Sequence, residues 1–105
     1  MPFRILITRD FDHMSEVAAG LVIDNINEVL KRKESFTLGL ATGNSPTGLY
    51  KHLAKAANSG AFDCGRITSF NLDEYIGLPG DNAQQRALHP ESYSFFMIQE
   101  LFALL

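Results

Sequence analysis

Two short polar segments carry side chains that could do chemistry, and each directly follows an apolar run. Residues 42–45 (Thr-Gly-Asn-Ser) follow the run that ends at Ala41, and residues 73–75 (Asp-Glu-Tyr) follow the run that ends at Leu72. The first segment offers hydroxyls, an amide and a flexible backbone, which suit an anion. The second offers two adjacent carboxylates, which suit proton transfer. Together they could bind an anionic substrate and move a proton on it.

The first segment precedes Pro46, and proline is common at the first position of a helix. We expect Ser45 to be the N-cap of that helix, whose first backbone N–H groups lack internal partners and carry partial positive charge. Gly43 would let the backbone approach an oxyanion, while Thr42, Asn44 and Ser45 would add hydrogen-bond donors. The segment is not a P-loop, because no Gly-Lys-Ser/Thr follows. It predicts a phosphate site, but a tight strand-to-helix turn with a good cap explains the same residues.

Asp73 and Glu74 are adjacent at the end of a predicted strand, where successive side chains point to opposite faces. One can aim into a cleft while the other pairs elsewhere. A carboxylate in a partly desolvated cleft gains proton affinity and can act as a general base. A solvated strand end or a helix cap is the alternative for this pair. His89 has two interpretations as well: it helps to cap the helix that begins near Pro90, or it helps to close over a substrate.

The rest of the sequence alternates short apolar runs with amphipathic segments. We expect strands at residues 3–8, 36–41 and 67–72, a helix from its N-cap Asp12 to about Lys33, helices at 46–57 and from about Pro90 to Leu104, and a long surface loop over 77–89. Strands alternating with helices are parallel, and helices cover such a sheet on its faces. The predicted fold is therefore α/β: a three-layer, parallel, Rossmann-like sheet with helices on both faces. Ligands of such sheets bind outside the carboxyl ends of the strands, which is where both polar segments lie.

Composition narrows the class of protein. The 105 residues suit a single domain, and 46% hydrophobic with 20% charged residues is ordinary for a globular protein. The net charge of −3 and the absence of a basic run longer than residues 31–33 argue against nucleic-acid binding. The single cysteine, Cys64, cannot form an internal disulfide, nothing in the sequence suggests a zinc cluster, and one free cysteine fits the reducing cytoplasm. No run is long enough for a membrane span, so we expect no membrane partner.

Three stretches in register resemble the glucosamine-6-phosphate deaminase/isomerase family: residues 38–53 (LGLATGNSPTGLYKHL), 70–79 (FNLDEYIGLP) and 89–97 (HPESYSFFM). The resemblance covers nearly the whole chain but only about the first half of a typical member. We therefore expect residues 1–105 to be the N-terminal part of a single sugar-phosphate isomerase/deaminase domain whose C-terminal half is absent. The chain alone would then be inactive, because the family's ring-opening residues would lie beyond Leu105.

The resemblance implies a hydrolase that is also an aldose–ketose isomerase of amino-sugar catabolism. It would convert an amino-sugar 6-phosphate and water to a ketose 6-phosphate and ammonia, by ring opening, a proton shift from C2 to C1 and loss of ammonia. Asp73 matches the family's proton-transferring aspartate. Residues 42–45 match its phosphate loop, and Glu74 and His89 are candidates for supporting roles. No cofactor and no metal are implied; the partner is a small sugar phosphate, and a homo-oligomer is left open.

Three related functions remain as alternatives. A galactosamine-6-phosphate isomerase is a close relative, and a 6-phosphogluconolactonase shares the fold and a similar phosphate loop. Lactonases tend to have Asp-Glu-Arg where this chain has Asp-Glu-Tyr, so Tyr75 favours the deaminase. A non-catalytic sugar-phosphate-binding module is the third alternative.

Overall fold

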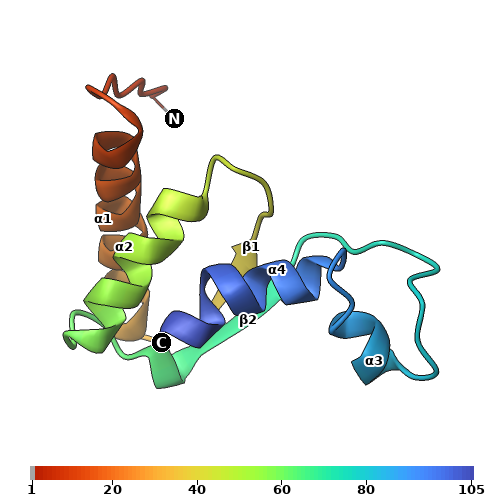
Figure 1. The fold of residues 1–105 in the computed structure, drawn as a ribbon. Helices are drawn as coiled ribbons and strands as arrows, with labels where there is room; N and C mark the ends of the chain where they lie inside the picture. Colours follow the sequence, from red (N-terminus) through yellow and green to blue (C-terminus); the bar gives the residue numbers. More distant parts are fainter. Residues whose placement is uncertain (1) are drawn as a thin grey trace.

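The structure, a computed structural model, describes residues 2–105 and is built on two strands. Its elements in chain order are α1 (Phe11–Leu30), β1 (Phe36–Leu40), α2 (Thr47–Asn58), the 3-10 helix η1 (Cys64–Arg66), β2 (Ile67–Asn71), α3 (Ala83–Ala87), α4 (Tyr93–Glu100) and the 3-10 helix η2 (Phe102–Leu104) (Figure 1). The two strands pair in parallel, and α2 lies in the connection between them. This part of the chain is thus the strand–helix–strand unit that the sequence predicts. No helix among residues 2–105 is long and apolar enough to cross a membrane.

The hydrophobic core lies on one face of this sheet, where α1, α2 and α4 gather. Every second residue of β1, from Phe36 to Leu40, packs against it, and Ile67 does so from β2. The alternating side chains on the opposite face are exposed, including Phe70, at 62%. The buried core consists of Ala19, Ile26, Leu40, Tyr50, Leu53, Ala54, Phe62, Met97 and Leu101. Helices therefore cover one face of the sheet within residues 2–105, whereas the sequence predicts helices on both.

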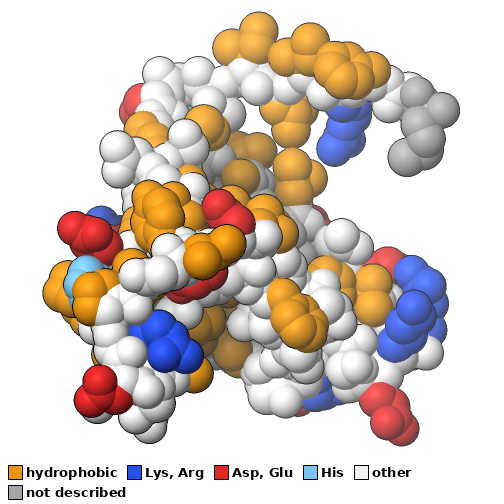
Figure 2. All heavy atoms as spheres, turned by 90° about the vertical axis from the view of Figure 1, so that its right-hand side faces the viewer, with side chains coloured by type: hydrophobic (Ala, Val, Ile, Leu, Met, Phe, Trp, Pro, Cys, Tyr) orange, Lys and Arg blue, Asp and Glu red, His pale blue; other side chains and the backbone are white. Residues whose placement is uncertain are grey.

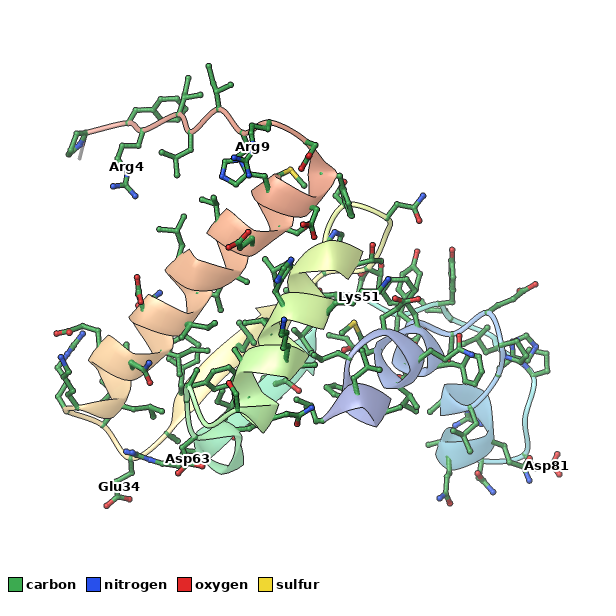
Figure 3. The ribbon with its side chains drawn as sticks, turned by 60° about the vertical axis from the view of Figure 1, so that its left-hand side comes forward. Arg4, Arg9, Glu34, Lys51, Asp63 and Asp81 are labelled. Atoms are coloured by element: carbon green, nitrogen blue, oxygen red, sulfur yellow. The ribbon has the colours of Figure 1, made fainter. Side chains whose placement is uncertain are left out.

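The prediction of a first strand at residues 3–8 is wrong. This segment has no regular secondary structure, and Phe3, Ile5 and Ile7 are 89%, 75% and 92% exposed. Figure 2 shows its hydrophobic side chains along an arm that extends from the body of the molecule, and Figure 3 shows Arg4 on the same arm. An apolar run has the propensity for a strand, but a strand also needs a neighbouring backbone to satisfy its N–H and C=O groups. Nothing in residues 2–105 pairs with this segment.

The boundaries of α1 differ from the prediction at both ends. Asp10, not Asp12, is the N-cap, and its carboxylate accepts a hydrogen bond from the backbone N–H of His13 at 2.8 Å. The helix ends at Leu30 rather than near Lys33. Arg66 explains this end, because its guanidinium donates to three backbone carbonyls at the end of α1 and just beyond it, at 2.7–3.1 Å.

The predicted long loop over residues 77–89 contains the short helix α3. Asn82 is its N-cap and accepts from the backbone N–H of Gln85 at 2.9 Å. The last helix also begins later than Pro90. Ser92 is the N-cap of α4 and accepts from the backbone N–H of Phe95 at 2.9 Å. Both corrections follow from side-chain caps, which define where a helix starts more sharply than apolar periodicity does.

Helices α1 and α2 approach each other closely at Gly48, the second residue of α2. Gly48 is buried, and a Cβ atom placed there would lie 2.2 Å from Ser15 Oγ and 2.9 Å from Phe11 Cε1. Ser15 is itself buried and donates its hydroxyl to the Phe11 carbonyl at 2.8 Å. This contact fixes the start of α2, and with it the end of the 42–45 segment, against α1.

Candidate functional site

The two polar segments leave the sheet at the same edge because the strands are parallel and in register. Leu40, the last residue of β1, is paired with Asn71, the last residue of β2. The pairing extends one step further, since the backbone N–H of Leu72 donates to the Leu40 carbonyl at 3.1 Å. Neighbouring strands lie about 4.8 Å apart, so segments 42–45 and 73–75 begin side by side. Their placement at the carboxyl ends of the strands is the one that the sequence predicts.

The segment 42–45 forms a turn that needs a glycine. Gly43 has φ of 111°, a backbone conformation that residues with a Cβ rarely adopt. The turn closes on the Asn44 carbonyl, which accepts from the Thr47 hydroxyl at 2.8 Å and, at 3.4 Å, from the Thr47 backbone N–H. The predicted cap at Ser45 is wrong: Pro46 occupies the N-cap position and makes no side-chain capping bond. Closure through Thr47 starts the helix one residue later than expected.

The N-terminus of α2 is consequently left open. Within residues 2–105 the backbone N–H groups of Gly48 and Leu49 have no hydrogen-bond acceptor. Unpaired N–H groups at a helix start carry partial positive charge and suit an anion. By contrast, the N–H groups in the first turn of α4 are all occupied by Ser92 and Glu74.

Tyr50 anchors the strand end from which the 42–45 segment starts. Its side chain is buried in the core, and its hydroxyl donates to the Ala41 carbonyl. Burial raises the pKa of Tyr50, although the hydrogen bond to Ala41 acts in the opposite direction. The sequence indicates only a core residue here; the signal for the anchor is that a buried tyrosine hydroxyl usually finds a partner.

Asp73, the predicted proton-transferring residue, is exposed and has no hydrogen-bond partner within residues 2–105. The desolvated cleft expected around it is therefore not formed by residues 2–105 alone. Its position two residues beyond the end of β2 places its backbone at the sheet edge, next to the start of the 42–45 segment. Its chemical role remains a prediction.

The side chain of Glu74 binds the start of α4. Its two carboxylate oxygens accept from the backbone N–H groups of Tyr75 and Tyr93, both at 2.9 Å, and from the backbone N–H and the hydroxyl of Ser94, both at 3.0 Å. Slight desolvation raises the pKa of Glu74, but these hydrogen bonds outweigh it and hold the pKa below its usual value. Glu74 therefore pairs with α4, whereas Asp73 has no hydrogen-bond partner within residues 2–105.

A tyrosine pair also joins residues 73–75, which follow β2, to α4; we call this contact region the junction. The rings of Tyr75 and Tyr93 have centroids 4.7 Å apart, and their hydroxyls lie 3.1 Å apart. The hydrogen bond with Tyr93 is the main cause of a raised pKa of Tyr75. A pocket of about 380 Å³ lies beside this junction and is lined partly by Glu74, Arg86 and Ser94; neither Asp73 nor the 42–45 segment lines it. The junction links the end of β2 to α4.

His89 lies in the turn before α4. Its Nδ1 accepts from the backbone N–H of Glu91 at 3.1 Å, and its carbonyl accepts from the backbone N–H of Ser92 at 2.9 Å. These bonds close the turn before α4, whose N-cap is Ser92, and contact between His89 and a substrate remains a prediction. Among residues 2–105, no group of three or more His, Cys, Asp or Glu side chains could hold a metal ion.

Comparison with known proteins identifies relatives over almost the whole chain. Glucosamine-6-phosphate deaminase of Clostridium perfringens (strain SM101 / Type A) is 42% identical over 99 residues, which are 94% of this chain and 36% of that protein. The enzyme of the same name from Shewanella loihica is 43% identical over 99 residues, 94% of this chain and 33% of the relative. No family model matches the chain.

A solved structure shares the fold. It is a monomeric glucosamine-6-phosphate deaminase described as a missing link of the NagB superfamily, with a TM-score of 0.78 and 32% sequence identity. The match covers 98% of this chain and 38% of that one. The chain thus spans about 36% of the length of curated relatives that it matches.

Proposed function

Because the chain is homologous to a part of the glucosamine-6-phosphate deaminases of the NagB superfamily, we propose that it belongs to a longer enzyme with that activity. The observation that carries the proposal is 42% identity over 99 of the 105 residues, a stretch long enough to include both polar segments. The reaction would release ammonia from glucosamine 6-phosphate and leave a ketose 6-phosphate. Residues 1–105 would be the N-terminal part of its single domain.

In this proposal the phosphate binds at residues 42–45. The support is the turn at Gly43, the open N–H groups of Gly48 and Leu49, and the positive end of the α2 dipole behind them. The hydroxyls of Thr42 and Ser45 and the amide of Asn44 would add donors. The site would hold an anion mainly through backbone dipoles, which fits the net charge of −3 of the chain.

Asp73 is then the group that moves the proton. With the phosphate over α2, the sugar would extend along the sheet edge toward the end of β2, and a carboxylate beside two adjacent carbons can take a proton from C2 and return it to C1. Asp73 suits this role because it has no competing partner, unlike Glu74. Bound substrate would supply the desolvation that residues 2–105 alone do not.

The remainder of the enzyme would complete the fold. Phe70 and Leu72, 62% and 68% exposed on or beside the uncovered sheet face, favour a covering layer there, as in the three-layer sheet predicted from the sequence. The unpaired apolar segment 3–7 would also find its partners in that completed sheet. The free Cys64 fits a cytoplasmic location.

The test is Asp73→Asn in the full-length protein, with ammonia release from glucosamine 6-phosphate as the assay. Loss of a proton-transferring group should lower kcat about a hundredfold or more. Asp81→Asn is the matched control, because Asp81 is also an exposed acid but lies near α3, and it should leave turnover within about twofold. Unchanged turnover in Asp73→Asn would remove this residue from the mechanism.

The same assay separates the alternative substrates. We expect faster turnover of glucosamine 6-phosphate than of galactosamine 6-phosphate or 6-phosphogluconolactone. Calorimetry of the 105-residue chain with glucosamine 6-phosphate tests the non-catalytic alternative, and we expect weak or no binding and negligible turnover by this chain alone. Tight binding without turnover, by the chain and by the full-length protein, would favour a binding module instead.

A further inference from the structure

The junction between β2 and α4 does more than cap a helix. Residues 72–75 have no regular secondary structure, so no strand or helix fixes the backbone that carries Asp73. Leu72 at its start still donates its N–H to the Leu40 carbonyl, and beyond that the hydrogen bonds to the folded body all run to α4. Glu74 accepts three of these from Tyr93 and Ser94, and the hydroxyls of Tyr75 and Tyr93 form another. Glu74 also accepts a fourth bond, from the N–H of Tyr75 within the stretch. Three of the four donors lie 19 or 20 residues later in the chain. The carboxylate therefore joins two elements that the chain connects only through the long loop containing α3.

We propose that Glu74 is a positioning residue: by holding the strand-end segment on the first turn of α4, it fixes the backbone of residue 73 and keeps the Asp73 carboxylate at the sheet edge beside residues 42–45. The inference rests on the proposed function, since it concerns the orientation of the group that moves the proton. It assigns the two adjacent acids separate tasks, with Asp73 acting on the substrate and Glu74 acting through Asp73.

The chemistry of the junction favours an ionised carboxylate over any neutral side chain. All four groups around Glu74 donate, and two of them are N–H groups at the positive end of the α4 dipole. A glutamine in its place could accept with its carbonyl, but its amide nitrogen would face donors and could not accept. Glu74→Gln should thus weaken the hold on the segment partly, and Glu74→Ala should leave the Tyr75–Tyr93 pair as the remaining link to α4.

The effect on catalysis follows from geometry. Misplacement of a reacting group by about 1 Å can cost about a hundredfold in rate. In the full-length protein we expect Glu74→Ala to lower kcat about ten- to a hundredfold with little change in KM, because the phosphate site at 42–45 is untouched. Glu74→Gln should fall between Glu74→Ala and the wild type.

A double-mutant cycle separates positioning from general destabilisation. If Glu74 acts through Asp73, then Glu74→Ala should lower the rate little further in an Asp73→Asn background. Ser92→Ala is the control, because Ser92 is the other side-chain cap of α4 and its hydroxyl bonds Ala87 and Phe95 rather than residues 73–75. The kcat of Ser92→Ala should stay within about twofold of wild type below its melting temperature. Multiplicative effects of Glu74→Ala and Asp73→Asn, or an equal loss in Ser92→Ala, would overturn the inference.

Hydrogen exchange gives a readout that does not depend on activity. In Glu74→Ala we expect faster amide exchange in the peptide covering 72–79 and at the start of α4, and unchanged exchange in α2. If the wild-type protein releases no ammonia, the proposed function fails, and the exchange data alone then test whether Glu74 holds residues 72–75 on α4. Unchanged exchange at 72–79 would overturn the positioning role, whatever the activity.

Discussion

Replacing Gly48 with alanine tests whether the close contact of α1 and α2 governs the stability of the fold. The added Cβ would lie 2.2 Å from Ser15 Oγ, 2.8 Å from Ser15 Cβ and 2.9 Å from Phe11 Cε1. Carbon atoms in packed interiors ordinarily lie about 3.5–4.0 Å apart. Rotation of the Ser15 hydroxyl cannot remove the overlap, because the Ser15 Cβ is itself too close. The two helices must therefore separate.

The expected cost follows from two opposing effects. Overpacking a well-packed site typically costs about 1–3 kcal/mol. Alanine is the better helix former, by up to about 1 kcal/mol, which offsets part of that cost. We expect Gly48→Ala to lower the free energy of unfolding by about 1–2 kcal/mol, a change of roughly five- to thirtyfold in the folded-to-unfolded ratio.

Urea denaturation followed by far-UV circular dichroism measures this change, and Gly20→Ala is the matched control. Gly20 lies inside α1, and a Cβ there would meet nothing within 4 Å. Gly20→Ala should therefore raise the free energy of unfolding by about 0.5–1 kcal/mol. A Gly48→Ala chain that unfolds at the wild-type urea concentration, or a Gly20→Ala chain that loses as much stability as Gly48→Ala, would refute the reasoning from the contact.

Two further predictions concern the anchors of the strand ends. Burial raises the pKa of Tyr50 above 10.0, so the unfolded chain loses this proton at a lower pH than the folded chain does. The contribution of Tyr50 to stability should therefore be complete below pH 10 and fall as the pH rises further. Between pH 9 and 11 a Tyr50→Phe chain should lose less stability in denaturation than the wild type, and equal losses would contradict the assignment. Arg66→Lys should lower the free energy of unfolding by about 1–2 kcal/mol, because an ammonium group cannot reach the three carbonyls that the guanidinium binds. Thermal denaturation at pH 7 measures this loss, with exposed Arg32→Lys as the control.

Local sequence was sufficient for the central strand–helix–strand unit. The apolar runs before residues 42–45 and 73–75 predict β1 and β2, and the stripe from Leu49 to Ala57 predicts α2. Parallel pairing followed from the order of these elements, since a helical connection brings the second strand back alongside the first. That order alone placed both polar segments at one edge of the sheet.

The sequence could not decide which of several suitable residues caps a helix. Asp10 and Asp12 are both acids near the start of α1, and only the path of the backbone decides that Asp10 receives the His13 N–H. Likewise Ser45 has the right side chain for a cap, yet the turn closes through Thr47 on the Asn44 carbonyl. A cap depends on distances within a few ångströms, and residue type does not specify them.

Partners distant in the sequence were decided by the tertiary structure alone. The strand predicted at residues 3–8 does not form, because strand propensity supplies no neighbouring backbone with which to pair. Glu74 finds its donors on Tyr93 and Ser94, across a loop whose length the sequence shows but whose path it does not. Local pattern thus determined which residues could reach the sheet edge, and tertiary packing decided that Glu74 is hydrogen-bonded to α4 while Asp73 has no hydrogen-bond partner within residues 2–105.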